Sequence, residues 1–262
     1  MSARGRIAAA ALAAAGWLAL AAAPAWPLDV KQLSPPDIEQ LHGILEQLEP
    51  VIGPKKLDGT AVLLTWDQLY APLALDDRAF LDGFRALKAS ELGATSHYFG
   101  EPSDQPALVA LGHQEVRKAG APVPLDPQFL PKPVHEAYQR MMQAMEQDLG
   151  RRLLVESGYR SPAYQLYLFC FYLPKHDYSI TETNRFVALP GHSEHGYPPR
   201  QAIDFINQDG INGEGQPEAF EALPEYGWLQ AHAGAYGFAL SYPRGNALNT
   251  AFEPWHWHHE PR

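Results

Sequence analysis

Residues 191–204 read Gly-His-Ser-Glu-His-Gly-Tyr-Pro-Pro-Arg-Gln-Ala-Ile-Asp, and residues 253–256 read Glu-Pro-Trp-His. Together these segments supply two imidazoles, His195 and His256, and a carboxylate, Asp204, nine residues after the first imidazole. A catalytic zinc site usually combines three such protein ligands with one position left open for water. The two segments therefore predict a zinc site that joins distant parts of the chain.

Glu253 adds a second carboxylate, three residues before His256, and the rigid pair Pro254-Trp255 lies between them. In a strand or a tight turn, this spacing could direct Glu253 toward the water of a metal site, where a carboxylate can act as a general base. Spacing alone is not specific, because the chain contains 11 histidines. On spacing alone, the same residues could equally be ordinary polar residues of the surface or the core.

The composition restricts the class of protein. The chain has 262 residues, of which 46% are hydrophobic and 19% are charged, as in a folded globular protein. Its formal net charge of −10 argues against binding to nucleic acid or to an anionic membrane surface. Cys170 is the single cysteine, so no disulfide can form within the chain. Because Cys170 lies in an apolar helical pattern, we expect a buried and unreactive thiol.

The N-terminus has the pattern of an export signal. Arg4 and Arg6 precede an apolar run over residues 7–23, and Ala23-Pro24-Ala25 offers a small-x-small cleavage site. We therefore predict a signal peptide over residues 1–25 and an exported protein of the periplasm or cell envelope. The mature chain would then carry no membrane span. The alternative is an uncleaved signal that remains in the membrane as an anchor.

Helical and strand patterns alternate irregularly in the second half of the chain. The pattern predicts helices from near Pro131 to Leu149, from Pro162 to Leu173 and over residues 224–237, and strands over residues 152–156, 238–242 and 254–258. Such an irregular alternation indicates an α+β fold, with helices packed on a small, largely antiparallel sheet.

The first half of the chain shows mainly helical patterns. One helix should begin at Ser34-Pro35, and another should run from Asp76 to Ala89, whereas residues 61–64 suggest a short strand. Residues 93–130 are rich in Gly and Pro, and we interpret them as loops with one short element near residues 107–111. This half contains no motif that suggests chemistry. We expect it to support the rest of the protein by packing; narrowing a cleft and binding a partner are the alternatives.

Three ordered motifs resemble a known family. Ser157-Gly158-Tyr159-Arg160-Ser161 with Gln165, the stretch 191–204 and the stretch 253–256 are similar to the three signatures of the VanY-type D-alanyl-D-alanine carboxypeptidases, which are zinc peptidases. The resemblance covers about residues 131–258. It implies a zinc peptidase fold of the hedgehog and DD-peptidase type.

The resemblance also implies roles for individual residues. His195, Asp204 and His256 would bind Zn²⁺, and Glu253 would serve as the general base and later as the acid. The expected activity is removal of a terminal D-alanine from peptidoglycan stem peptides. An L,D-carboxypeptidase or a peptidoglycan endopeptidase that uses the same site is the nearest alternative. A non-catalytic protein that binds zinc or the cell wall is a second one.

Arg160 would be a catalytic residue in the same resemblance. It would neutralise charge on the scissile carbonyl oxygen or hold a substrate carboxylate, and the planar fork of an arginine suits both tasks. Gln165 and Ser193 would contact the substrate. The resulting domain organisation is a signal peptide over residues 1–25, an N-terminal accessory region over 26–120 and a zinc peptidase domain over 121–262.

One stretch departs from the family pattern. Relatives usually have His-x-x-Gly-x-Ala-x-Asp, whereas here the step from His195 to Asp204 is two residues longer and Arg200 stands where the glycine is expected. Strand faces repeat every two residues, so we expect Asp204 to remain a ligand. His258 and His259 replace the usual residues after the last motif, and we expect them near the metal but not bound to it.

Overall fold

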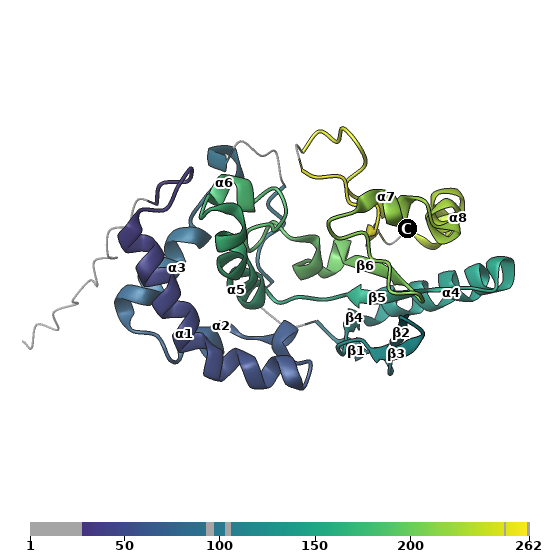
Figure 1. Ribbon diagram of the computed structural model, residues 1–262, viewed down its shortest axis with the longest axis horizontal. Helices are drawn as coiled ribbons and strands as arrows, with labels where there is room; N and C mark the ends of the chain where they lie inside the picture. The colour runs from purple at the N-terminus through teal and green to yellow at the C-terminus, as the bar shows by residue number, and fades with distance from the viewer. Residues whose placement is uncertain (1–27, 93–96, 103–105, 249, 261–262) are drawn as a thin grey trace, which may run out of the picture.

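A four-stranded antiparallel sheet forms the centre of the second half of the chain (Figure 1). The computed structural model describes residues 28–92, 97–102, 106–248 and 250–260. The strands, in spatial order, are β5 (Leu153–Ser157), β6 (Ala202–Asn207), β8 (His256–His259) and β7 (Phe238–Leu240). Every neighbouring pair is antiparallel, which confirms the predicted α+β fold. The predicted export signal lies outside the described residues.

Helices cover one face of this sheet. The helices α4 (Lys132–Leu149) and α8 (Pro224–His232) share an apolar core with the sheet, and the short α7 (Pro217–Glu221) adds to it. Alternate residues of β6, Ile203 and Phe205, contribute to this core. Side chains alternate between the faces of a strand, so Asp204 between them points away from the core, toward the opposite side of the sheet.

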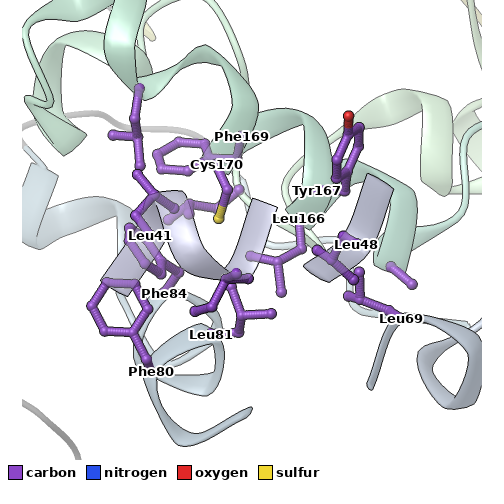
Figure 2. Packing of buried hydrophobic residues seen from close by; sticks show 14 of the residues in the cluster. Leu41, Leu48, Leu69, Phe80, Leu81, Phe84, Leu166, Tyr167, Phe169 and Cys170 are labelled. Carbon is purple, nitrogen blue, oxygen red and sulfur yellow. The ribbon is translucent and has the colours of Figure 1, made fainter. Parts of the chain in front are cut away.

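A second core joins the first half of the chain to α5 (Pro162–Tyr172), as Figure 2 shows. The helices α1 (Pro35–Leu57), α2 (Trp66–Tyr70) and α3 (Leu75–Arg85) all bury apolar side chains there. The buried stripe of α5 therefore packs against the first half of the chain and not under the sheet. The short helix α6 (Ile180–Thr183) follows α5 and completes this layer.

Three local predictions for residues before 132 are wrong. Residues 61–64 do not form a strand: Ala61–Leu63 is a 3₁₀ helix, and the carbonyl of Leu64 accepts a hydrogen bond from the Ser161 hydroxyl at 2.6 Å. The helix predicted to end at Ala89 ends at Arg85 and is followed by a 3₁₀ helix over Ala89–Leu92.

The third error concerns residues 93–130, where only one short element was expected. Here β1 (Leu108–Ala110) pairs with β4 (Phe129–Pro131), and β2 (Glu115–Lys118) forms a hairpin with β3 (Ala121–Pro124). The Gly and Pro residues of this stretch obscured the strand pattern. β1 and β4 are distant from each other in sequence, whereas β2 and β3 are joined by a tight turn at Ala119-Gly120, where both φ angles are positive.

Other element ends lie close to their predicted positions. The helix predicted over residues 224–237 ends at His232 and continues as a 3₁₀ helix, and the last two strands shift by one or two residues. The remaining 3₁₀ helices are Leu173–His176, Glu194–Gly196, Pro198–Arg200 and Ala233–Tyr236. Within the described part of the chain, each helix is too short or too polar to cross a membrane.

The single thiol gives a direct test of the second core. Cys170 is buried on α5, and burial raises the pKa of its thiol. Because the thiolate is the reacting species, we expect a disulfide reagent such as DTNB to modify the native protein at pH 8 about 10³-fold or more slowly than the protein unfolded in urea. Rapid labelling of the native protein would contradict this packing.

Candidate metal centre

The structure brings His195, Asp204 and His256 together on the side of the sheet away from α4. His195 lies in the 3₁₀ helix before β6, Asp204 lies on β6, and His256 opens β8. Asp204 and His256 face each other in the register of β6 and β8. Each of the three offers one ligand atom within 4.8 Å of the others.

His195 presents an unprotonated nitrogen to this cluster. Its Nδ1 lies 2.7 Å from the carbonyl oxygen of Gly158, so Nδ1–H donates there and Nε2 carries a lone pair. Burial, and then the nearby guanidinium of Arg160, lower the pKa of His195 to about 4, so the ring is neutral. Nε2 lies 3.1 Å from Asp204 Oδ2 and forms no hydrogen bond within the described residues.

The arrangement around Asp204 fits a metal ion. Burial raises the pKa of Asp204, but the two histidines outweigh it and hold the pKa well below its usual value, so the group is a carboxylate. A carboxylate oxygen and an imidazole lone pair at 3.1 Å repel each other unless a cation binds both. Two imidazoles and one carboxylate form a donor set that zinc prefers.

His256 lies between two carboxylates. Its Nδ1 is 2.8 Å from Asp204 Oδ1, and its Nε2 is 3.0 Å from Glu194 Oε2. Burial lowers the pKa of His256, but the attraction of Asp204 and Glu194 outweighs it and raises the pKa to about 10. Glu194 is 4% exposed and is a part of the site that the sequence reasoning missed. The pair Glu194-His195 in the motif was the available signal, but only the fold shows that Glu194 contacts the other histidine.

Glu253 lies beside the cluster with one carboxylate oxygen 3.7 Å from His256 Nδ1. Its backbone position is fixed by a hydrogen bond from its own N–H to the carbonyl of Tyr242 and by another from the His256 N–H to the Glu253 carbonyl, both 3.1 Å long. Burial is the main cause that raises the pKa of Glu253 to about 7. A carboxyl group with this pKa can both accept and return a proton near neutral pH.

Arg160 follows β5 and is tied to the same site. Its backbone N–H donates to the carbonyl of His195 at 3.1 Å, and its Nη1 donates to the Ser157 hydroxyl at 3.3 Å. Its Nε is buried without a hydrogen-bond partner among the described residues. The turn before it requires glycine, because a Cβ on Gly158 would lie 2.4 Å from the carbonyl oxygen of Phe129 on β4.

Gln165 and Ser193 lie close to the site in sequence and are both buried. The amide of Gln165 donates to the carbonyl of Ala188 at 2.7 Å, which ties α5 to the segment that leads into the metal motif. Ser193 immediately precedes the 3₁₀ helix that carries His195. These positions define what each side chain touches, while contact with a substrate remains a prediction for both.

The longer stretch between His195 and Asp204 forms a 3₁₀ helix over Pro198–Arg200. Tyr197 stacks on Phe99 with ring centroids 5.2 Å apart, and Arg200 Nε donates to Glu194 Oε1 at 2.7 Å. His258 Nδ1 lies 2.7 Å from the Ser241 hydroxyl, so it sits behind the ligands and outside the metal cluster.

A cavity of about 510 Å³ adjoins the site. Glu194, Arg200 and Tyr242 form its end near the metal cluster, and the Tyr242 ring lies 4.7 Å from the ring of His256. The remaining lining residues are His97, Tyr98, Phe99, Asn184, Ala188, His192, Tyr197, Leu248 and Thr250. The sequence reasoning missed residues 97–99, although their aromatic character within a Gly- and Pro-rich stretch was a signal.

The segment 97–99 is attached directly to the metal motif. The Phe99 N–H donates to the carbonyl of Gly191 at 2.8 Å, and His192 Nδ1 lies 3.2 Å from the carbonyl of His97. Tyr98 lies against Gly191, where an added Cβ would come within 2.4 Å of its ring. The first half of the chain thus forms one wall of the cleft, in addition to packing on α5.

The chain is similar to known carboxypeptidases. The chain is 31% identical over 133 residues to the candidate carboxypeptidase YodJ of Bacillus subtilis, and the match covers 49% of this chain and 45% of that protein. The chain therefore spans less than half the length of this curated relative. Among solved structures, the LdcB LD-carboxypeptidase has a TM-score of 0.45 at 26% identity, covering 61% of this chain and 69% of that one.

A D,D-pentapeptidase VanY from a VanB-type vancomycin resistance cassette, solved with Zn(II), has a TM-score of 0.46 at 22% identity, covering 66% of this chain and 88% of that one. A comparison with protein families also gives a match. The family described as VanY, D-alanyl-D-alanine carboxypeptidase, matches residues 127–262, which is just over half of the 262 residues. The chain belongs to the VanY family of D-alanyl-D-alanine carboxypeptidases.

Proposed function

We propose that this chain is an exported, zinc-dependent carboxypeptidase that removes a terminal D-alanine from peptidoglycan stem peptides. The observation that carries the proposal is the buried cluster of His195, Asp204 and His256 with the carboxyl group of Glu253 beside it. A purely structural metal site has no need of a spare carboxylate with a pKa near neutrality, whereas hydrolysis requires one. Membership of the VanY family supports the same activity.

His195 Nε2, His256 Nδ1 and Asp204 would hold the zinc ion. Zinc supplies a Lewis acid that polarises a carbonyl group and makes water more acidic. Glu253 takes a proton from the attacking water as the new C–O bond forms, and it returns this proton to the amine nitrogen as the C–N bond breaks. The proton is conserved, and the products are a shortened peptide and a free amino acid.

The cavity beside Glu194 is suited to the part of the peptide that precedes the scissile bond. Its walls include the aromatic rings of Tyr98, Phe99, Tyr197 and Tyr242, and Tyr98 is 60% exposed. We propose that residues 26–120 serve both as packing support and as this wall, and that residues 121–262 carry the zinc peptidase domain. We also propose residues 1–25 as the signal that brings the enzyme to the periplasm or cell envelope, where its substrate is.

Removing the aromatic wall should weaken substrate binding more than turnover. For Tyr98→Ala we expect KM for a pentapeptide substrate to rise about two- to tenfold with kcat nearly unchanged, since an aromatic contact contributes about 0.5–1.5 kcal/mol. Phe171→Ala is a suitable control, because Phe171 is also exposed (43%) but does not line the cavity. An unchanged KM in Tyr98→Ala, measured by steady-state kinetics, would remove residues 97–99 from the substrate cleft.

The bond that is cut can be identified by mass spectrometry of purified muropeptides incubated with the zinc-loaded protein. Loss of one alanine from pentapeptides supports the proposed D,D-carboxypeptidase. Loss of one alanine from tetrapeptides only would identify an L,D-carboxypeptidase, and separation of cross-linked dimers would identify an endopeptidase. If no muropeptide changes although zinc is bound, the chain is a non-catalytic zinc protein and the proposal fails.

A further inference from the structure

A buried polar network lies behind His256, on the side opposite Asp204. Glu194 is its centre: Oε2 lies 3.0 Å from His256 Nε2 and accepts a hydrogen bond from the Ser241 hydroxyl at 2.5 Å, while Oε1 accepts from Arg200 Nε at 2.7 Å. His258 Nδ1, 2.7 Å from the same hydroxyl, extends the network. Both carboxylate oxygens of Glu194 therefore have hydrogen-bond partners, and these partners fix the orientation of the carboxylate.

The charges in this network explain why Arg200 is needed. Glu194 is 4% exposed, and an ionised carboxylate at such a position is unfavourable unless a cation and hydrogen bonds compensate for the lost water. Arg200 provides the fixed positive charge. Its position comes from the 3₁₀ helix Pro198–Arg200, inside the stretch that is two residues longer than the family pattern.

The orientation of His256 depends on this carboxylate. As a metal ligand, His256 would be a neutral imidazole with one N–H and one lone pair, and here each nitrogen faces a carboxylate. With Glu194 accepting from Nε2–H, the lone pair is on Nδ1, beside Asp204 and the metal position. Without Glu194, Asp204 at 2.8 Å is the remaining acceptor, and it favours the N–H on Nδ1, where a metal ligand needs a lone pair.

We infer that Arg200 and Glu194 are positioning residues: Arg200 holds Glu194 as an oriented carboxylate, and Glu194 holds His256 with Nδ1 available to the metal. This inference rests on the proposed zinc site but not on the identity of the substrate. It assigns a role to the longer stretch before Asp204, which carries an arginine that supports the metal ligand on the neighbouring strand.

The test is zinc affinity of the full-length protein, measured by competition with a chromophoric chelator. We expect Glu194→Gln to bind zinc about 10- to 100-fold more weakly, because partners of metal-bound histidines typically contribute this much. Arg200→Gln should weaken binding about tenfold by the same reasoning, with Arg200→Lys between it and the wild type. Arg244→Gln is the matched control, since Arg244 pairs with Glu218 and Glu221 as Arg200 pairs with Glu194 and Glu260, but its ion pairs lie outside the network.

A second readout separates positioning from general loss of structure. The cobalt-substituted protein should show an altered visible absorption spectrum in Glu194→Gln, while the metal-free variants keep the circular dichroism and melting temperature of the wild type. Zinc affinities within twofold of the wild type in both Glu194→Gln and Arg200→Gln would overturn the inference. If Arg200→Gln does not fold, Arg200→Lys decides: an affinity equal to the wild type would overturn it.

Failure of this inference and failure of the proposed function are distinguishable. A wild-type protein that binds zinc but cleaves no muropeptide would refute the peptidase and leave the roles of Glu194 and Arg200 intact. Variants with wild-type zinc affinity would refute those roles and leave the peptidase intact.

Discussion

Glu253→Gln should lower the rate of D-alanine release by about 10²–10⁴-fold, the usual contribution of a positioned general base. Glutamine has nearly the same shape, but it cannot accept a proton from water at neutral pH. Zinc content should stay at the wild-type level, because Glu253 is not one of the three ligands and its carboxylate lies 3.7 Å from His256 Nδ1. The measurement combines kinetics on a pentapeptide with metal analysis of the same protein sample.

A matched control is Glu218→Gln, which removes an exposed carboxylate that is not part of the metal cluster and should leave activity unchanged. Retained activity in Glu253→Gln would contradict the assignment of the base. Loss of zinc together with activity would instead make Glu253 part of the metal site. The proposed chemistry is supported only if the activity of Glu253→Gln falls while its zinc content stays at the wild-type level.

Arg160→Ala should lower kcat/KM by about 10²–10³-fold, since loss of one group that stabilises developing negative charge usually raises the barrier by about 3–4 kcal/mol. The hydrogen bond from Nη1 to Ser157 holds the guanidinium, and its Nε is buried without a partner among the described residues. Arg160→Lys should recover little of the loss, because an ammonium group cannot reproduce the planar fork.

The kinetic constants distinguish the two roles open to Arg160. If it holds the terminal carboxylate, the loss appears in KM, and a substrate with an amidated C-terminus is poor for the wild type but not further impaired by Arg160→Ala. If it stabilises the carbonyl oxygen, the loss appears in kcat with both substrates. If Arg160→Ala has the same kinetic constants as the wild type with both substrates, both roles are excluded. Arg185→Ala, which removes an exposed arginine of an i,i+3 ion pair, serves as the control.

The metal cluster was predictable from sequence because its residues belong to local motifs. Asp204 and His256 occupy strands, and strand pairing brings them face to face in register. The two extra residues before Asp204 are absorbed by a short 3₁₀ helix, so they do not disturb this register. Spacing alone left these residues open, and the resemblance to the family motifs supplied the ligand set; the alternation of side chains along a strand then kept Asp204 in it despite the longer stretch.

Contacts between distant segments could not be predicted in this way. The tie from Glu194 to His256 spans 62 residues, and the wall formed by residues 97–99 meets Gly191 across more than 90 residues. The short element expected near residues 107–111 is β1, whereas β4 was missed for the same reason, since it is short and is stabilised by its distant partner β1. The sequence places Glu194 beside His195 in the motif, but only the fold shows that Glu194 contacts His256.

The helix α5 lies within the proposed zinc peptidase domain in sequence but in the core of the first half in space. Its N-cap, Ser161, directly follows Arg160 and donates its hydroxyl hydrogen bond to Leu64 in the first half. The two halves are consequently not interchangeable parts. If relatives exchanged their N-terminal regions by recombination, α5 and α6 would have to be inherited with the region that buries them, because a crossover near residue 120 would separate these helices from their core.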